Sequence, residues 1–95
     1  MIDNIEKEKI TLTLKIADDM TNERLQRFPN YGVYIHARDQ VEFIRGILAN
    51  GKIPNQKEKD FVDIALMSVK ELDVSDPDFS DVLCELSYQF KRLSY

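Results

Sequence analysis

The short segment Phe28-Pro29-Asn30-Tyr31-Gly32 constrains the fold of this chain more than any other. Pro29 cannot extend a preceding helix and disfavours helical backbone at the residue before it, so we expect a first helix to end at about Phe28. Gly32 tolerates positive φ, which allows a tight reversal of the chain. The segment therefore predicts a corner between two helices.

Apolar residues recur at helical spacing on both sides of this corner. The pattern predicts four helices: about residues 3–28, residues 33–50, a third from a cap at Asn55 to about residue 72, and a fourth from Asp76-Pro77 to about residue 93. The alternation over residues 11–16 is read as helix because both of its flanks continue the helical pattern. We predict an all-α fold, a compact up-and-down bundle of about four helices, as one domain over residues 1–95.

The apolar positions also predict which faces are buried. The last helix has the cleanest stripe, formed by Phe79, Val82, Leu83, Leu86, Phe90 and Leu93. In the first helix two adjoining sets make a wide arc, which predicts packing by more than one neighbour and a possible break near Thr21-Asn22: Ile10, Leu14, Ala17, Leu25 and Phe28, with Ile5, Leu12, Ile16 and Met20 beside them. In the third helix we expect one face with a flank: Phe61, Ile64, Ala65, Ser68 and Leu72, with Val62, Leu66 and Val69.

Charge and composition exclude several classes of protein. The net charge of the 95 residues is −4, whereas binding through nucleic-acid phosphates needs a basic stripe. No run of about 20 apolar residues exists, and the charged start does not resemble a signal peptide. A single cysteine, Cys84, fits a reducing cytoplasm. We therefore expect a cytoplasmic protein that binds neither nucleic acid nor membrane.

The sequence contains no catalytic or metal-binding motif that we can identify. One histidine, His36, is too few for a di-metal carboxylate site or a His-Glu-x-x-His zinc site. The acids around Asp76 lack the glycine and the final glutamate of a calcium loop, and the three scattered glycines make no phosphate loop. We expect Cys84 to fill space in the core and His36 to pair with Gln40. The chain is predicted to be no enzyme and to need no metal or cofactor.

Two features instead suggest a surface that binds a partner, although each has a structural alternative. Tyr31 and Tyr34 flank the corner, and tyrosine is enriched at protein interfaces; both rings can equally cover the end of the bundle. Between Glu71 and Glu85 the chain has six acidic residues and no lysine or arginine. Such a run is usually a solvated loop and helix start, and alternatively it meets a positively charged partner.

Three separated segments together resemble a known family. They are Arg27-Phe-Pro-Asn-Tyr-Gly-Val-Tyr34, Ala37-Arg-Asp-Gln-Val-Glu-Phe-Ile-Arg-Gly-Ile-Leu48 and Lys70-Glu-Leu-Asp-Val-Ser-Asp-Pro77. Over roughly residues 10–93 the chain resembles type VI secretion immunity proteins that neutralise an NAD(P)-hydrolysing effector toxin. The resemblance implies a small helical cytoplasmic protein, without activity of its own, that binds a cognate toxin domain and occludes its active site. It leaves open whether that toxin is an NAD(P) glycohydrolase, an ADP-ribosyltransferase or a nucleotide pyrophosphokinase.

The implied mechanism assigns candidate binding residues. A toxin cleft that accepts a dinucleotide is expected to be electropositive, so Asp73, Asp76 and Asp78 are predicted to face its basic groups. Tyr31, Tyr34 and Arg38 are the predicted anchors beside them. In an up-and-down bundle the connections after the first and third helices lie at the same end, which predicts that these residues are neighbours. The alternative is a small helical adaptor or regulator of a non-toxin partner, and −4 is a modest charge for a nucleic-acid mimic.

Overall fold

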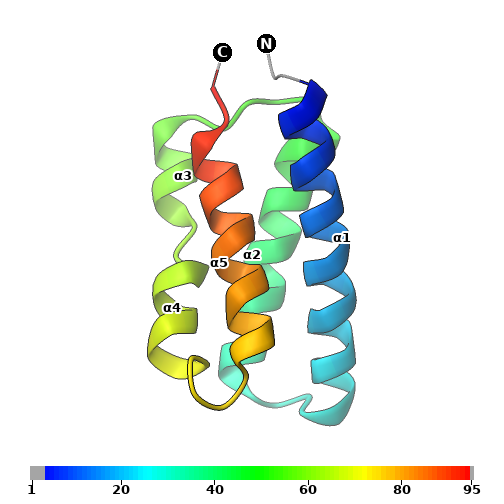
Figure 1. Cartoon of the computed structure of the whole chain (residues 1–95), viewed down its shortest axis with the longest axis vertical. Helices are drawn as coiled ribbons and strands as arrows, with labels where there is room; N and C mark the ends of the chain where they lie inside the picture. Colours follow the sequence, from blue (N-terminus) through cyan, green and yellow to red (C-terminus); the bar gives the residue numbers. More distant parts are fainter. Residues whose placement is uncertain (1–3, 95) are drawn as a thin grey trace.

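The computed structural model describes residues 4–94, and these residues form five α-helices and no strand. The helices are α1 (Asn4–Arg27), α2 (Gly32–Ala49), α3 (Gln56–Phe61), α4 (Ile64–Glu71) and α5 (Pro77–Arg92). Figure 1 shows α3 and α4 one above the other, in the place of a single longer helix beside α2 and α5. The predicted all-α bundle is confirmed.

Most helix ends follow the sequence signals, but Gly32 does not take the positive φ expected at the corner: it is the first residue of α2, and the one glycine with positive φ among residues 4–94 is Gly51. α1 ends at Arg27, directly before the Phe28-Pro29 step, and α5 begins with Pro77 at its first position. The predicted start of the first helix at Asp3 lies outside the described residues. No break occurs at Thr21-Asn22, and the helix continues through both residues. Thr21 is buried, and its hydroxyl donates a hydrogen bond of 2.6 Å to the carbonyl of Ala17 in the same helix.

The prediction of one continuous third helix is wrong, because the helix is interrupted at Val62 and Asp63. The Gln40 side chain forms hydrogen bonds to the backbone on both sides of the interruption. Its Nε2 donates to the Phe61 carbonyl at 3.0 Å, and its Oε1 accepts from the Asp63 backbone N–H at 2.8 Å. Val62 is fully buried at this point, whereas Phe61, expected on the core face, is 59% exposed. The change of direction turns Phe61 outward, where its ring packs on Phe43 with centroids 4.6 Å apart.

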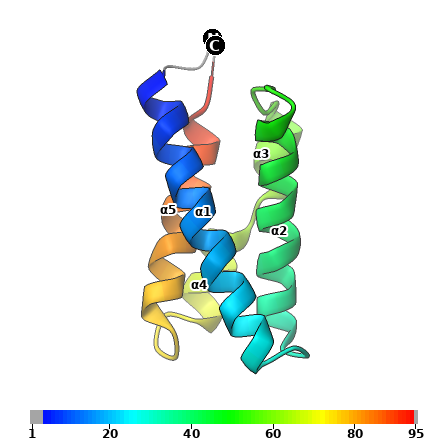
Figure 2. The same ribbon diagram turned by 90° about the vertical axis from the view of Figure 1, so that its right-hand side faces the viewer.

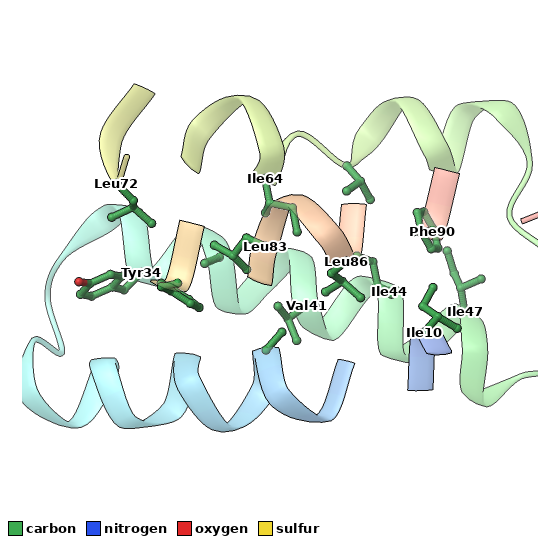
Figure 3. Close-up of a cluster of buried hydrophobic side chains, with 14 of the residues drawn as sticks. Ile10, Tyr34, Val41, Ile44, Ile47, Ile64, Leu72, Leu83, Leu86 and Phe90 are labelled. Carbon is green, nitrogen blue, oxygen red and sulfur yellow. The ribbon is translucent and has the colours of Figure 1, made fainter. Parts of the chain in front are cut away.

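The core fills the space enclosed by the helices, and side chains from α1, α2, α4 and α5 meet in it (Figure 3). The stripe predicted for the last helix supplies much of it, since Phe79, Leu83, Leu86, Phe90 and Leu93 are at most 1% exposed. Val82 packs against this core from a partly buried position. Tyr34 lies at one end of the core layer (Figure 3).

The wide apolar arc expected on the first helix is only partly buried. Ile10 and Ala17 are in the core, but Leu12 is 63% exposed and Ile16 is 43% exposed. Figure 2 shows α1 running obliquely in front of α5, with its end close to the start of α2, and α5 and α2 are the helices it contacts most. One stripe is sufficient for those contacts, so the second part of the arc remains at the surface. Four further side chains that were expected to be buried are exposed: Ile5, Phe28, Leu66 and Val69.

Asn55 forms the predicted cap at the start of α3. Its side-chain oxygen accepts from the Glu58 N–H at 2.8 Å, and Glu58 accepts from the Asn55 N–H at 2.9 Å. Replacing Asn55 with alanine removes one half of this reciprocal pair and is expected to lower the free energy of unfolding by about 1 kcal/mol. Urea unfolding of the Asn55→Ala and Asn55→Ser variants measures this; serine should restore most of the loss, and equal losses in both would contradict it.

Candidate functional site

The α1–α2 corner and the connection between α4 and α5 lie at the same end of the bundle (Figures 1 and 2). They are joined by a hydrogen bond of 2.9 Å, in which the Tyr34 hydroxyl donates to Asp76 Oδ2. The predicted proximity of the aromatic corner and the acidic connection is therefore confirmed. The candidate site is built on this end of the molecule.

Asp76 is the centre of a cluster that links three helices. Arg24, near the end of α1, donates from Nε to Asp76 Oδ2 at 2.7 Å and from Nη2 to Asp76 Oδ1 at 2.9 Å. With the Tyr34 hydroxyl, the carboxylate accepts three hydrogen bonds. The Arg24 and Asp76 side chains are only 13% and 14% exposed. The guanidinium also lies over the Phe79 ring, 4.8 Å from its centroid. We call Arg24, Tyr34, Asp76 and Phe79 the latch.

The latch determines the protonation of its members. The hydrogen bonds from Arg24 hold the pKa of Asp76 below its usual range, against the opposing effect of burial, and the Tyr34 hydroxyl adds to the lowering. Burial raises the pKa of Tyr34, and its hydrogen bond to Asp76 raises it further. Asp76 is therefore a carboxylate paired with Arg24. It precedes α5 as predicted, and its side-chain oxygens bond to Arg24 and Tyr34.

A groove of about 540 Å³ opens beside the latch and is lined by Arg27, Phe28, Tyr31, Tyr34, Ser75 and Asp76. The Tyr31 ring meets the Tyr34 ring edge-on, with centroids 4.8 Å apart and planes at 86°. Tyr31 is 41% exposed and Phe28 is 52% exposed, whereas Tyr34 is 8% exposed. The groove thus has a buried tyrosine in its wall and two accessible aromatic rings.

The six predicted binding residues occupy three different kinds of position. Tyr31, Tyr34 and Asp76 are brought together in the groove. Asp73 and Asp78 are exposed in the adjacent connection and first turn of α5, and neither has an ion pair with any residue from 4 to 94. Arg38 does not line the groove; it lies seven residues beyond Tyr31, about two turns along α2, and contacts Asp39 at 3.3 Å.

The residue that the sequence reasoning missed is Arg24. A signal for it is present, because Ile10, Leu14, Ala17, Thr21 and Arg24 follow one another at spacings of 4, 3, 4 and 3. An arginine that continues a buried stripe requires an acidic partner. The spacing alone does not identify Asp76 as that partner, which lies 52 residues further along the chain.

The second segment of the family resemblance has a structural role in α2. Gln40 bridges the α3–α4 interruption, Phe43 packs on Phe61, and Arg45 pairs with Asp18 of α1. The expected pairing of His36 with Gln40 is wrong, since His36 Nε2 lies 2.6 Å from Asp63 Oδ1 at the same interruption. These side chains join α2 to its neighbours.

Over residues 4–94 no three histidine, cysteine, aspartate or glutamate side chains gather in a way that could hold a metal ion. Cys84 is half-buried, and its sulfur lies 3.9 Å from the Ala65 carbonyl. None of the helices within these residues is long and apolar enough to span a bilayer.

Comparison with known proteins now identifies the family. The Tsi6 family profile matches residues 11–92, which include the latch, the groove and the whole of α2. The chain is 30% identical over 66 residues to the protein named immune protein Tsi6 from Pseudomonas aeruginosa strain PAO1, with 70% of this chain and 69% of that protein covered. No solved structure matches the chain. On the family match and this relative together, the chain belongs to the Tsi6 family.

Proposed function

We propose that this protein is an immunity protein that binds a cognate effector toxin, delivered by type VI secretion, in the cytoplasm and occludes the toxin's active site. Its membership of the Tsi6 family carries the proposal, since the relative from Pseudomonas aeruginosa is named an immune protein.

We further propose that the toxin-binding surface is the end of the bundle that contains the groove. Tyr31, Asp73 and Asp78 are exposed there and are available for direct contact, while Arg38 extends the surface along α2. Tyr34 and Asp76 act differently in this proposal, because their polar atoms already bond to one another and to Arg24. Their role is to hold the α1–α2 corner against the start of α5, so that the exposed groups are presented in one geometry.

The proposed target is a toxin that consumes NAD(P). A cleft that accepts the phosphates of a dinucleotide needs positive charge, and the exposed acids beside the groove are complementary to such a cleft. Opposite potentials also accelerate association, which favours an inhibitor that must meet its toxin before the nucleotide pool is consumed.

Co-expression in bacteria with the toxin domain encoded beside this gene tests the proposal, with growth and cellular NAD(P) as the two measurements. We expect the toxin alone to stop growth and deplete NAD(P), and this protein to restore both. Rescue of growth with no NAD(P) depletion in the toxin-only culture would retain immunity and remove the proposed chemistry. Failure to rescue at confirmed expression of both chains would contradict immunity and favour an adaptor role.

A further inference from the structure

We propose that the groove receives an apolar or aromatic side chain of the partner, and that lysine or arginine residues flanking that side chain meet Asp73 and Asp78 on the rim. This inference rests on the proposed function, because the partner is the effector domain. The inference divides the surface into the groove, which is neutral and aromatic, and an acidic border formed by Asp73 and Asp78. These two parts contribute to binding in different ways.

The charges inside the groove are already balanced. Asp76 is the groove's carboxylate, and it is neutralised by the two hydrogen bonds from Arg24. Arg27 is its positive group, and Arg27 Nε pairs with Glu23 at 3.0 Å. A basic side chain entering the groove would lose its hydration without finding a free carboxylate, which is unfavourable. The groove therefore suits an uncharged side chain.

The groove has the shape and rings to hold such a group. Its volume of about 540 Å³ lies within the range of pockets that bury small ligands, so one large side chain fits inside it. Tyr31 stands edge-on to Tyr34, and the Phe28 ring centroid is 6.1 Å from that of Tyr34. Arg27 lies over the Phe28 ring, 5.7 Å from its centroid, whereas no arginine or lysine of residues 4–94 lies over the Tyr31 ring. Aromatic rings stack favourably on such faces.

The border of the groove differs from its interior. Ser75 is part of the lining, and Asp73 and Asp78 lie two residues before it and three residues after it. Both acids are exposed and have no ion pair within residues 4–94. Such charges act on the approach of a partner more than on the lifetime of the complex. The partner segment that fits both parts is an apolar side chain with basic neighbours.

Binding of purified variants to the effector domain encoded beside this gene tests the division, measured by surface plasmon resonance from low to physiological salt. We expect Tyr31→Ala to weaken binding about 30-fold or more, mainly through faster dissociation, with an unchanged salt dependence. Tyr31→Phe keeps the ring and should bind as the wild type does. Asp73→Asn combined with Asp78→Asn should slow association about 3- to 10-fold and flatten its salt dependence.

Tyr88→Ala is the matched control, because Tyr88 is also an exposed tyrosine but lies outside the groove, and its loss should leave the affinity unchanged. Wild-type affinity of Tyr31→Ala would overturn the inference while leaving the proposed function in place. The inference would also be overturned if the association rate of Tyr31→Ala lost as much of its salt dependence as that of the double variant Asp73→Asn with Asp78→Asn. Absence of binding by the wild-type protein would remove the proposed function and the inference together.

Discussion

The Asp76→Ala variant is expected to lose about 3 kcal/mol of unfolding free energy. The substitution removes the acceptor of three hydrogen bonds and leaves the Arg24 guanidinium, which is mostly shielded from water, with the more exposed Glu23 as its one remaining ion-pair partner among residues 4–94. A buried charge that loses its counter-ion retains its desolvation cost. Urea unfolding at neutral pH measures the loss.

Two matched variants separate the latch from general effects of the acidic connection. Asp73→Ala removes an exposed acid of the same connection and should change stability by less than about 0.5 kcal/mol. Replacing both partners, as in Arg24→Met with Asp76→Ala, should cost less than the sum of the single changes, because no orphaned charge remains. Additive losses in the double variant would show that the pair is not coupled.

The latch also predicts a pH dependence with a definite sign. The pKa of Asp76 is lower in the folded protein than in the unfolded chain, so its stabilisation is fully present above the unfolded pKa of about 3.9. That stabilisation is lost as the pH falls through the folded pKa. The difference in unfolding free energy between wild type and Asp76→Asn should therefore shrink below about pH 4. A difference that stays constant from pH 7 to about pH 2.5 would contradict this assignment.

The Gln40→Leu variant is expected to lose about 2–3 kcal/mol of unfolding free energy, although leucine has a similar size. Gln40 is 2% exposed, and its amide bonds to the backbone at both sides of the α3–α4 interruption. Leucine would leave the Phe61 carbonyl and the Asp63 N–H without this partner. Gln40→Glu should be at least as harmful, since a carboxylate cannot donate to the Phe61 carbonyl.

Gln26→Leu is the control for this prediction, because Gln26 is an exposed glutamine on α1. Its replacement should alter the unfolding free energy by less than about 0.5 kcal/mol. Hydrogen exchange of the Val62 and Asp63 amides gives a local readout, and both should exchange faster in Gln40→Leu. A variant as stable as the wild type, with unchanged exchange, would show that the interruption does not depend on Gln40.

The parts of the fold that were predictable depend on local chemistry. Pro29, Asn55 and Pro77 each act on the backbone within a few residues, so the corner and two helix starts follow from the sequence. The interruption at Val62 was not predictable, because residues 56–71 contain neither glycine nor proline. The side chain that bonds to the backbone on both sides of the interruption is Gln40, a residue of another helix. Periodicity describes one helix at a time and does not include such a contact.

The candidate site was likewise predictable only in part from the sequence. The up-and-down topology was sufficient to predict that Tyr34 and Asp76 lie at one end of the bundle. It was not sufficient to predict that they bond to each other and to Arg24, since that depends on side-chain direction at the ends of three helices. The functional weight of Tyr34 and Asp76 changes as a result. In the proposed binding surface both act mainly as supports, and Tyr31, Arg38, Asp73 and Asp78 remain the predicted direct contacts.

The latch has a consequence for the kinetics of folding. Arg24 and Asp76 are 52 residues apart, so their contact closes a long loop and carries an entropic cost that local helical turns do not. We expect this contact to form late in folding, because the entropy of loop closure is lost before the contact can stabilise the chain. Weakening the latch should then speed unfolding more than it slows folding. On this expectation, the pairing of these two residues lengthens the time that a folded molecule persists before it opens.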